Sequence, residues 1–171
     1  MDATVKSQHQ ITTQLFVNMV IKEWTTQNDR FSELVDGLTD EQIAKDISAG
    51  RNSGTYLLGH LTAVHDAMLP LLGFGDKLYP SLYQTFVKSP DKSGQSIPAI
   101  SELRNQWKQV TKVLSDHIGN ANPEEWFTRH TSVSEEDFAK EPHRNKLNVL
   151  INRTNHLSNH RGQMVLLKKK D

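Results

Sequence analysis

The residues best suited to chemistry in this sequence are two histidines in the stretch NHLSNHRGQM, residues 155–164. His156 and His160 are four positions apart, so on a helix their side chains stand one above the other, with about 5–6 Å between their Cβ atoms. Both imidazoles can then reach one metal ion. Such pairs also arise by chance on ordinary polar helix faces, and a metal site needs at least a third ligand from another element.

The composition limits what that third ligand can be. The chain has eight histidines and no cysteine, which excludes disulfides, thiolate zinc sites and cysteine nucleophiles. A second helical segment, GHLTAVHD, offers His60 and His65 on the two sides of its apolar stripe, so periodicity does not choose between them. The small residues Gly59, Ala63 and Ala67 favour His60, because they leave room for an ion and a substrate.

The other four histidines are interpreted as structural or solvated. His9 lies near the N-terminus, and His130 and His143 fall in polar segments between helices. His117 lies near the end of a predicted helix, where a cation suits the negative end of the helix dipole.

The elements that must position these residues are helices. Apolar residues recur every three or four positions in segments 4–34, 53–72, 99–119 and 146–168, and no segment shows a convincing strand period. The first segment carries apolar residues from Ile11 and Leu15 through to Leu34. The pattern predicts an all-α, four-helix bundle with two long inter-helix connections, formed by one domain over residues 1–171.

Turn and cap residues set the expected ends of these helices. Asp36-Gly37 ends the first, and Thr39 with Gln42 matches a capping box that begins a short helix. Asn52 or Ser53 caps the second helix, and Gly119 is expected to cap the end of the third. The connection over residues 73–97 is long for a compact domain and is expected to pack over one end of the bundle.

The last helix places the histidine pair beside its core face. Leu150, Leu157 and Met164 form the obvious apolar stripe, and the histidines lie about 100° from it. Val149 and Leu167 share the line of the histidines. The imidazoles are therefore expected to point into an inner seam of the bundle rather than into solvent.

Charge and hydropathy exclude several classes of partner. Lys plus Arg number 20 and Asp plus Glu number 20, so there is no basic field for nucleic acid. No apolar run approaches the roughly 18 residues of a membrane span, and the first residues do not resemble a signal peptide. A soluble, cytoplasmic protein with no nucleic-acid and no membrane partner is expected.

Several of these stretches resemble a known family. NSGTYLLGHLTAVHDAML is similar to the second helix of DinB-like proteins, the damage-inducible four-helix-bundle group and not the DNA polymerase of that name. NHLSNHRGQM resembles the last-helix signature of that family, a His-x-x-x-His followed by Arg-Gly-Gln. The short LTDEQIA and NPEEWF stretches also lie where such proteins have turns, so the resemblance covers nearly the whole chain.

The resemblance implies a DinB-like bundle, often a homodimer, with a divalent metal held by three histidines. Carried over to this sequence, the metal ligands are His60, His156 and His160. Zinc and nickel are the ions expected, since imidazole suits both. Some members resemble thiol-dependent transferases and isomerases, others are called hydrolases, and many have no known activity.

Three imidazoles leave at least one coordination position open, which is typical of catalytic sites. The expected function is a metal-dependent enzyme that acts by thiol transfer or hydrolysis on a small electrophilic substrate. A low-molecular-weight thiol cosubstrate would supply the sulfur, because the chain has no cysteine. The alternative is a non-catalytic bundle that its metal stabilises, or a stress-related binding protein.

The sequence does not identify a catalytic residue beyond the metal ligands. Tyr56, Asp66, Asn159 and Gln163 are near enough to the histidines to be considered as a general base. A supporting or surface role is favoured for each of them. Arg161 is expected to make a buried bond within the bundle, and the alternative is that it binds a substrate carboxylate.

Overall fold

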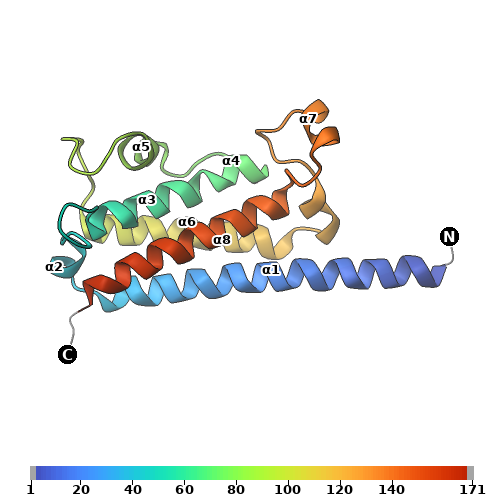
Figure 1. Ribbon diagram of the computed structural model, residues 1–171, viewed down its shortest axis with the longest axis horizontal. Coiled ribbons are helices and arrows are strands. Elements are labelled where there is room, and N and C mark those ends of the chain that lie inside the picture. Colours follow the sequence, from blue (N-terminus) through green and yellow to red (C-terminus); the bar gives the residue numbers. More distant parts are fainter. Residues whose placement is uncertain (1–2, 169–171) are drawn as a thin grey trace.

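The computed structural model describes the backbone of residues 3–168 and the side chains of residues 8–168. Four long helices form its framework: α1 (Ala3–Gly37), α3 (Gly54–Asp66), α6 (Ile100–Asn120) and α8 (Lys146–Met164). Figure 1 shows them lying along a common direction as a bundle, with α1 beside α8 and α3 beside α6. Residues 3–168 contain isolated β-bridges but no strand, so the predicted all-α, four-helix bundle with two long connections is confirmed.

Shorter helices lie between and after the long ones. They are α2 (Asp40–Ile43), α4 (Met68–Leu72), α5 (Pro80–Tyr83), the π-helix η1 (Gln84–Lys88), the 3-10 helix η2 (Pro123–Phe127), α7 (Glu135–Lys140) and the 3-10 helix η3 (Val165–Leu167). Four of them, α5, η1, η2 and α7, were not predicted as helices beyond a short turn near Pro123. No helix in the described part of the chain combines the length and the apolar character that crossing a bilayer requires.

The long helix α1 is buried over only part of its length. Trp24 and Phe31 are buried to 1% and 0% exposure, whereas Ile11 and Leu15 are 58% and 60% exposed. Figure 1 shows the reason, since the N-terminal part of α1 runs beyond the ends of the other helices. The apolar period predicted the helix correctly, and the structure shows that the apolar residues of its first turns lie outside the core.

The cap residues are confirmed in part. Thr39 and Gln42 form the predicted capping box, and Ser53 is the N-cap of α3. Gly119 lies inside α6, which ends at Asn120, so the predicted glycine cap is wrong. The second predicted helix is divided at Ala67, because Pro70 has no N–H to donate to the carbonyl of the preceding turn.

The connection between α4 and α6 packs along the side of α3 rather than over one end of the bundle. Its helices α5 and η1 contact α3, and Leu82 and Phe86 are buried there. The carboxylate of Asp66, at the end of α3, accepts hydrogen bonds from the backbone N–H groups of Leu78 and Tyr79 at 2.7 and 2.9 Å. This contact fixes the start of the connection against the helix that carries His60.

Candidate metal centre

Three histidine side chains meet between α3 and α8. The Nε2 atom of His156 lies 3.2 Å from Nε2 of His60 and 3.1 Å from Nε2 of His160. One nitrogen from each ring lies within 4.8 Å of the others, an arrangement that could hold a metal ion. The fold thus joins the helical pair on α8 to His60, 96 positions earlier in the chain, which is the histidine that the family resemblance implied.

Local structure explains why each helix presents its histidine here. The helix α8 buries Leu150, Leu157 and Met164 in the core, which turns the histidine pair toward α3, as expected. On α3, Gly59 has no side chain, and a Cβ at this position would lie 2.4 Å from the ring of Phe86. The space predicted for an ion and a substrate beside His60 is therefore filled by Phe86.

Hydrogen bonds turn two of the rings so that their Nε2 lone pairs face the centre. The Nδ1–H of His60 donates to the carbonyl oxygen of Phe86 at 2.8 Å, and Nδ1–H of His160 donates to Oε1 of Gln163 at 2.8 Å. Because Nδ1 carries the proton of each neutral ring, Nε2 is an acceptor. Metal-bound histidines are usually oriented by such a contact on the second nitrogen.

The environment keeps the rings of His156 and His60 neutral. Burial, followed by repulsion from His160, His60 and Arg153, lowers the pKa of His156 to about 4. Burial also lowers the pKa of His60, against the opposing effect of its bond to the Phe86 carbonyl. Neutral imidazole is the form that binds metals.

The distances and donor types fit a divalent ion. Nitrogens at about 2.05 Å from a tetrahedral zinc are about 3.3 Å apart, and at an octahedral ion about 2.9 Å apart. The Nε2 separations of 3.1 and 3.2 Å between His156 and the other two rings lie between these values. Within the described residues, no fourth histidine or carboxylate joins the group, which leaves room for a non-protein ligand.

Two cavities border the three histidines on different sides. One, of about 560 Å³, is lined by His160 and Gln163 together with Arg51 and Leu57. The other, of about 540 Å³, is lined by His156 together with residues of α8 and the preceding connection. Both volumes are in the range of small-molecule sites, and each cavity reaches one histidine of the group.

The alternative ligand His65 lies outside the group. It is completely buried, its Nδ1–H donates to the Leu61 carbonyl at 3.0 Å, and its ring packs edge-on against Trp107 at 4.8 Å between centroids. Asp66 is also structural, because both of its oxygens accept backbone N–H groups. The position of His65 removes the ambiguity that helix periodicity left between His60 and His65.

The remaining polar candidates from the sequence lie in three different environments. The Tyr56 hydroxyl donates to the carbonyl oxygen of Ser89 at 2.8 Å, and its ring stacks on His60 at 6.2 Å. Asn159 is exposed. Arg161 is half-buried, and its Nε atom has no hydrogen-bond partner among the described residues, so the predicted buried bond is not seen at that atom.

Sequence reasoning missed the residues that line the cavity beside His156. His130, placed among the solvated histidines, lies on this wall with Arg144 and Arg153. The available signal was the position of Arg153, which precedes His156 by three residues and therefore shares its helix face. His130 and Arg144 come from the long connection before α8, and no sequence period places them there.

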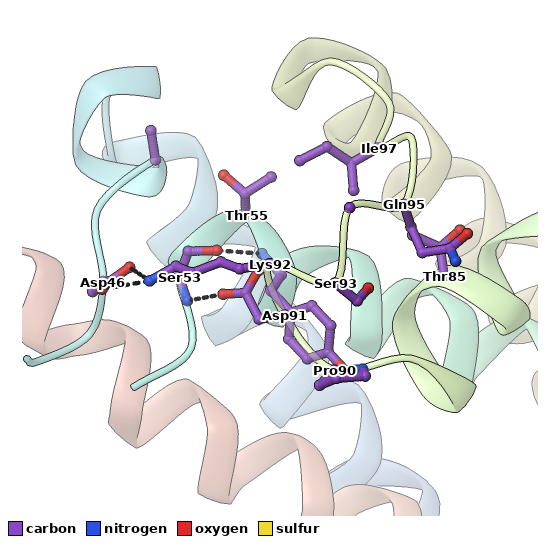
Figure 2. A pocket seen from close by; sticks show the side chains of 13 residues that line it. Asp46, Ser53, Thr55, Thr85, Pro90, Asp91, Lys92, Ser93, Gln95 and Ile97 are labelled. Carbon is purple, nitrogen blue, oxygen red and sulfur yellow. Dashed lines mark hydrogen bonds and ion pairs between the residues drawn. The ribbon is translucent and has the colours of Figure 1, made fainter. Parts of the chain in front are cut away.

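A separate cavity of about 320 Å³ lies between the α2–α3 loop and the connection before α6. Figure 2 shows Lys92 reaching Asp46, at 2.7 Å, and Asp91 reaching the backbone N–H of Ser53, at 2.7 Å. The charged side chains of this cavity are therefore satisfied within the protein, and their contacts join the two loops. Tyr56 links this cavity to the histidine group, since it lines the cavity and stacks on His60.

Comparisons with known proteins agree with this architecture. A crystal structure of a conserved protein from Enterococcus faecalis is similar to this chain with a TM-score of 0.60 and 15% identity, covering 88% of this chain and 93% of the other. At that identity the likeness concerns the fold alone. No curated protein matches the sequence. The sequence model of the DinB family matches residues 10–170, and this chain therefore belongs to the DinB family.

Proposed function

We propose that this protein binds one zinc or nickel ion through His60, His156 and His160 and is a metal-dependent enzyme. The observation that carries the proposal is the convergence of three Nε2 atoms from α3 and α8 with no fourth protein ligand among the described residues. Structural zinc sites are usually closed by four protein ligands, whereas catalytic sites keep a position open. The donor set is compatible with both zinc and nickel and does not decide between them.

The proposed reactions are thiol transfer and hydrolysis on a small electrophilic substrate. A divalent ion at this site would supply Lewis-acid chemistry, polarising an electrophile or activating water or a thiol. The protein itself has no cysteine, so in thiol transfer a low-molecular-weight cosubstrate brings the sulfur. Such a thiol stays reduced in the cytoplasm, which is where we place the protein.

The protein's own residues position the ligands and admit the substrate. The Phe86 carbonyl and the Gln163 amide hold the rings of His60 and His160. The cavities beside His156 and His160 provide access from two sides. This access supports an enzyme over a bundle in which the metal only stabilises the fold, since a purely structural ion needs no cavity beside it.

We also propose that the protein acts as a homodimer, with a small molecule rather than a nucleic acid as its ligand. The support is a set of exposed apolar side chains on the projecting part of α1: Ile11, Leu15, Phe16 and Met19. Large apolar residues grouped on an otherwise polar surface are typical of protein interfaces. The zero formal charge offers no field for nucleic acid.

Metal analysis of the purified protein tests the proposal. We expect about one equivalent of zinc or nickel in the wild type and a loss of tight binding in His60→Ala, His156→Ala and His160→Ala. The exposed residue His143 provides a control, since His143→Ala removes a histidine without touching the site. His65→Ala should also keep its metal; equal retention by His160→Ala and His65→Ala would refute the ligand assignment.

Activity assays then separate the two reactions. The metal-loaded protein would be tested with an electrophile in the presence and absence of a small thiol, and with ester and amide substrates. Turnover that is lost in His160→Ala supports the enzyme. Full metal occupancy without turnover on any of these substrates would favour the non-catalytic bundle.

A further inference from the structure

One arginine occupies an unusual position beside the histidine group. Arg153 lies on α8 one turn before His156, is half-buried, and lines the same cavity of about 540 Å³ as His156. Its positive charge contributes to the lowered pKa values of both His156 and His60. The guanidinium is therefore close to two of the three proposed metal ligands.

Arg153 has no carboxylate partner in the described part of the chain, unlike three other arginines. Arg104 pairs with Asp40, Arg129 with Glu135, and Arg144 with Glu141. Among the described residues, no hydrogen bond or ion pair involves the Arg153 side chain, and burial lowers its pKa. The one neighbour that counteracts this lowering of the Arg153 pKa is Tyr83, which carries no carboxylate.

A partly buried cation without a counter-ion is costly, because the charge loses hydration and gains no compensating attraction. The half-buried Arg161 also lacks a partner for its Nε atom, but it lines neither cavity beside the histidines. Arg153, in contrast, faces a space large enough for a small molecule. The missing partner of Arg153 can therefore be a group on the ligand.

The cavity wall indicates what kind of ligand fits. No aspartate or glutamate lines it, so an anion meets no repulsion there. Leu71 and Val149 supply apolar surface beside the polar groups of Arg153, Asn148 and Asn152. A short organic chain can lie against the apolar residues while its charged end reaches the guanidinium.

We propose that Arg153 binds a carboxylate of the substrate and thereby directs the reacting end of the molecule toward the three-histidine site. A carboxylate is favoured because its two oxygens match the planar fork of the guanidinium. The inference deepens the proposed function and rests on it, since the three histidines are taken as the reacting end. Arg153 acts as a specificity-determining residue for a small organic acid.

Titration calorimetry on the full-length protein tests the carboxylate site with succinate as the probe. We expect succinate to bind the wild type and Arg153→Gln to weaken this binding by at least about tenfold, as for loss of a charge-assisted hydrogen-bonded pair. Arg153→Lys, which keeps the charge but loses the fork, should give an intermediate affinity. Succinamide, the neutral analogue, should bind the wild type at least about tenfold more weakly than succinate.

Arg51 provides a matched control, because it lines the other cavity, beside His160. Arg51→Gln should leave succinate binding unchanged. Undetectable binding by the wild type, equal affinity in Arg153→Gln, or an equal loss in Arg51→Gln would each overturn the proposal. Tighter binding of inorganic phosphate than of succinate would overturn the assignment to a carboxylate.

Metal content and thermal unfolding, measured on every variant, keep the two hypotheses separate. If Arg153→Gln does not fold, the comparison of Arg153→Lys with the wild type carries the test. Succinate binding that depends on Arg153 in a protein that takes up no zinc or nickel would support the carboxylate site and refute the metal site. A protein that binds metal at the three histidines but shows no Arg153-dependent binding of succinate would support the metal site and refute the carboxylate site.

Discussion

The Nδ1–H of His60 donates to the backbone carbonyl of Phe86 at 2.8 Å, and the ring of Phe86 occupies the space that Gly59 leaves open. One aromatic residue of η1 therefore both packs against α3 and orients the histidine that α3 contributes. Phe86 is completely buried, so this contact does not depend on an exposed side chain. The geometry of the histidine group is tied in this way to the packing of the connection before α6.

Gly59→Ala should damage both the packing and the site. The added Cβ would lie 2.4 Å from the Phe86 ring, so the ring must shift, and we expect this shift to disturb the Phe86 carbonyl that holds His60. We expect a loss of about 1–3 kcal/mol in the free energy of unfolding and about 10–100-fold weaker zinc binding. Denaturant unfolding and competition with a zinc chelator measure the two effects.

Gly119→Ala is the matched control for that substitution. Gly119 is also helical, but a Cβ there would have no atom within 4 Å. The change should leave zinc binding as it is and stabilise the protein by about 0.4–1 kcal/mol through the unfolded state. Unaltered zinc affinity in Gly59→Ala as well would show that the Phe86 contact does not set the orientation of His60.

A second prediction concerns the ligand-orienting amide. Gln163 is exposed, and its Oε1 accepts the Nδ1–H of His160 at 2.8 Å. Gln163→Leu should weaken zinc binding by about 10–100-fold, because the ring of His160 loses its fixed orientation. Gln163→Glu keeps an acceptor and should retain the affinity, so equal losses in the two variants would contradict this role.

The fold could be predicted because each framework helix carries its own apolar period. Trp24 and Phe31 on α1, and Leu150 and Leu157 on α8, are buried as that period requires. The exposure of Leu15 could not be predicted, because the period of one helix does not reveal how far its neighbours extend. Tertiary packing, and not local sequence, decides which part of an amphipathic helix is covered.

The histidine group, like the fold, could be predicted from the sequence only in part. The spacing of His156 and His160 places them on one face of a helix, and the family resemblance supplied His60. The function of Gly59 could not be derived, because Phe86 lies 27 positions later in a connection with no regular period. Arg153 was within reach of helix geometry, but its lack of a carboxylate partner is visible only in the folded chain.

The buried His65 predicts how stability depends on pH. Burial lowers the pKa of His65 to about 3, against an ordinary value of 6.5 that the unfolded chain retains. Between these two values the unfolded state binds a proton that the folded state does not, so the free energy of unfolding falls as the pH falls below about 6.5. One such proton contributes a slope of about 1.4 kcal/mol per pH unit.

The variant His65→Leu tests this effect in metal-free protein, by denaturant unfolding between pH 7.5 and about 4.5. The free energy of unfolding should fall less steeply toward low pH than in the wild type, and the difference in slope should correspond to the uptake of about one proton. Ile43→Val, at a completely buried position, should lower stability by about 0.5–1.5 kcal/mol equally at every pH. A His65→Leu curve parallel to that of the wild type would rule out His65 as a source of acid sensitivity.

The projecting part of α1 gives the last prediction. Leu15 and Met19 are 60% and 61% exposed, one turn apart on the same helix face. If this face joins two copies of the chain, Leu15→Lys with Met19→Lys should convert the dimer to a monomer in light scattering at micromolar concentration, because four lysines would meet at the interface. Gln14→Lys adds charge at an exposed polar position of the same helix and should leave the dimer intact. The double variant should still unfold cooperatively on heating, since neither side chain is in the bundle core. A wild type that is already monomeric would show that this face does not join two copies of the chain.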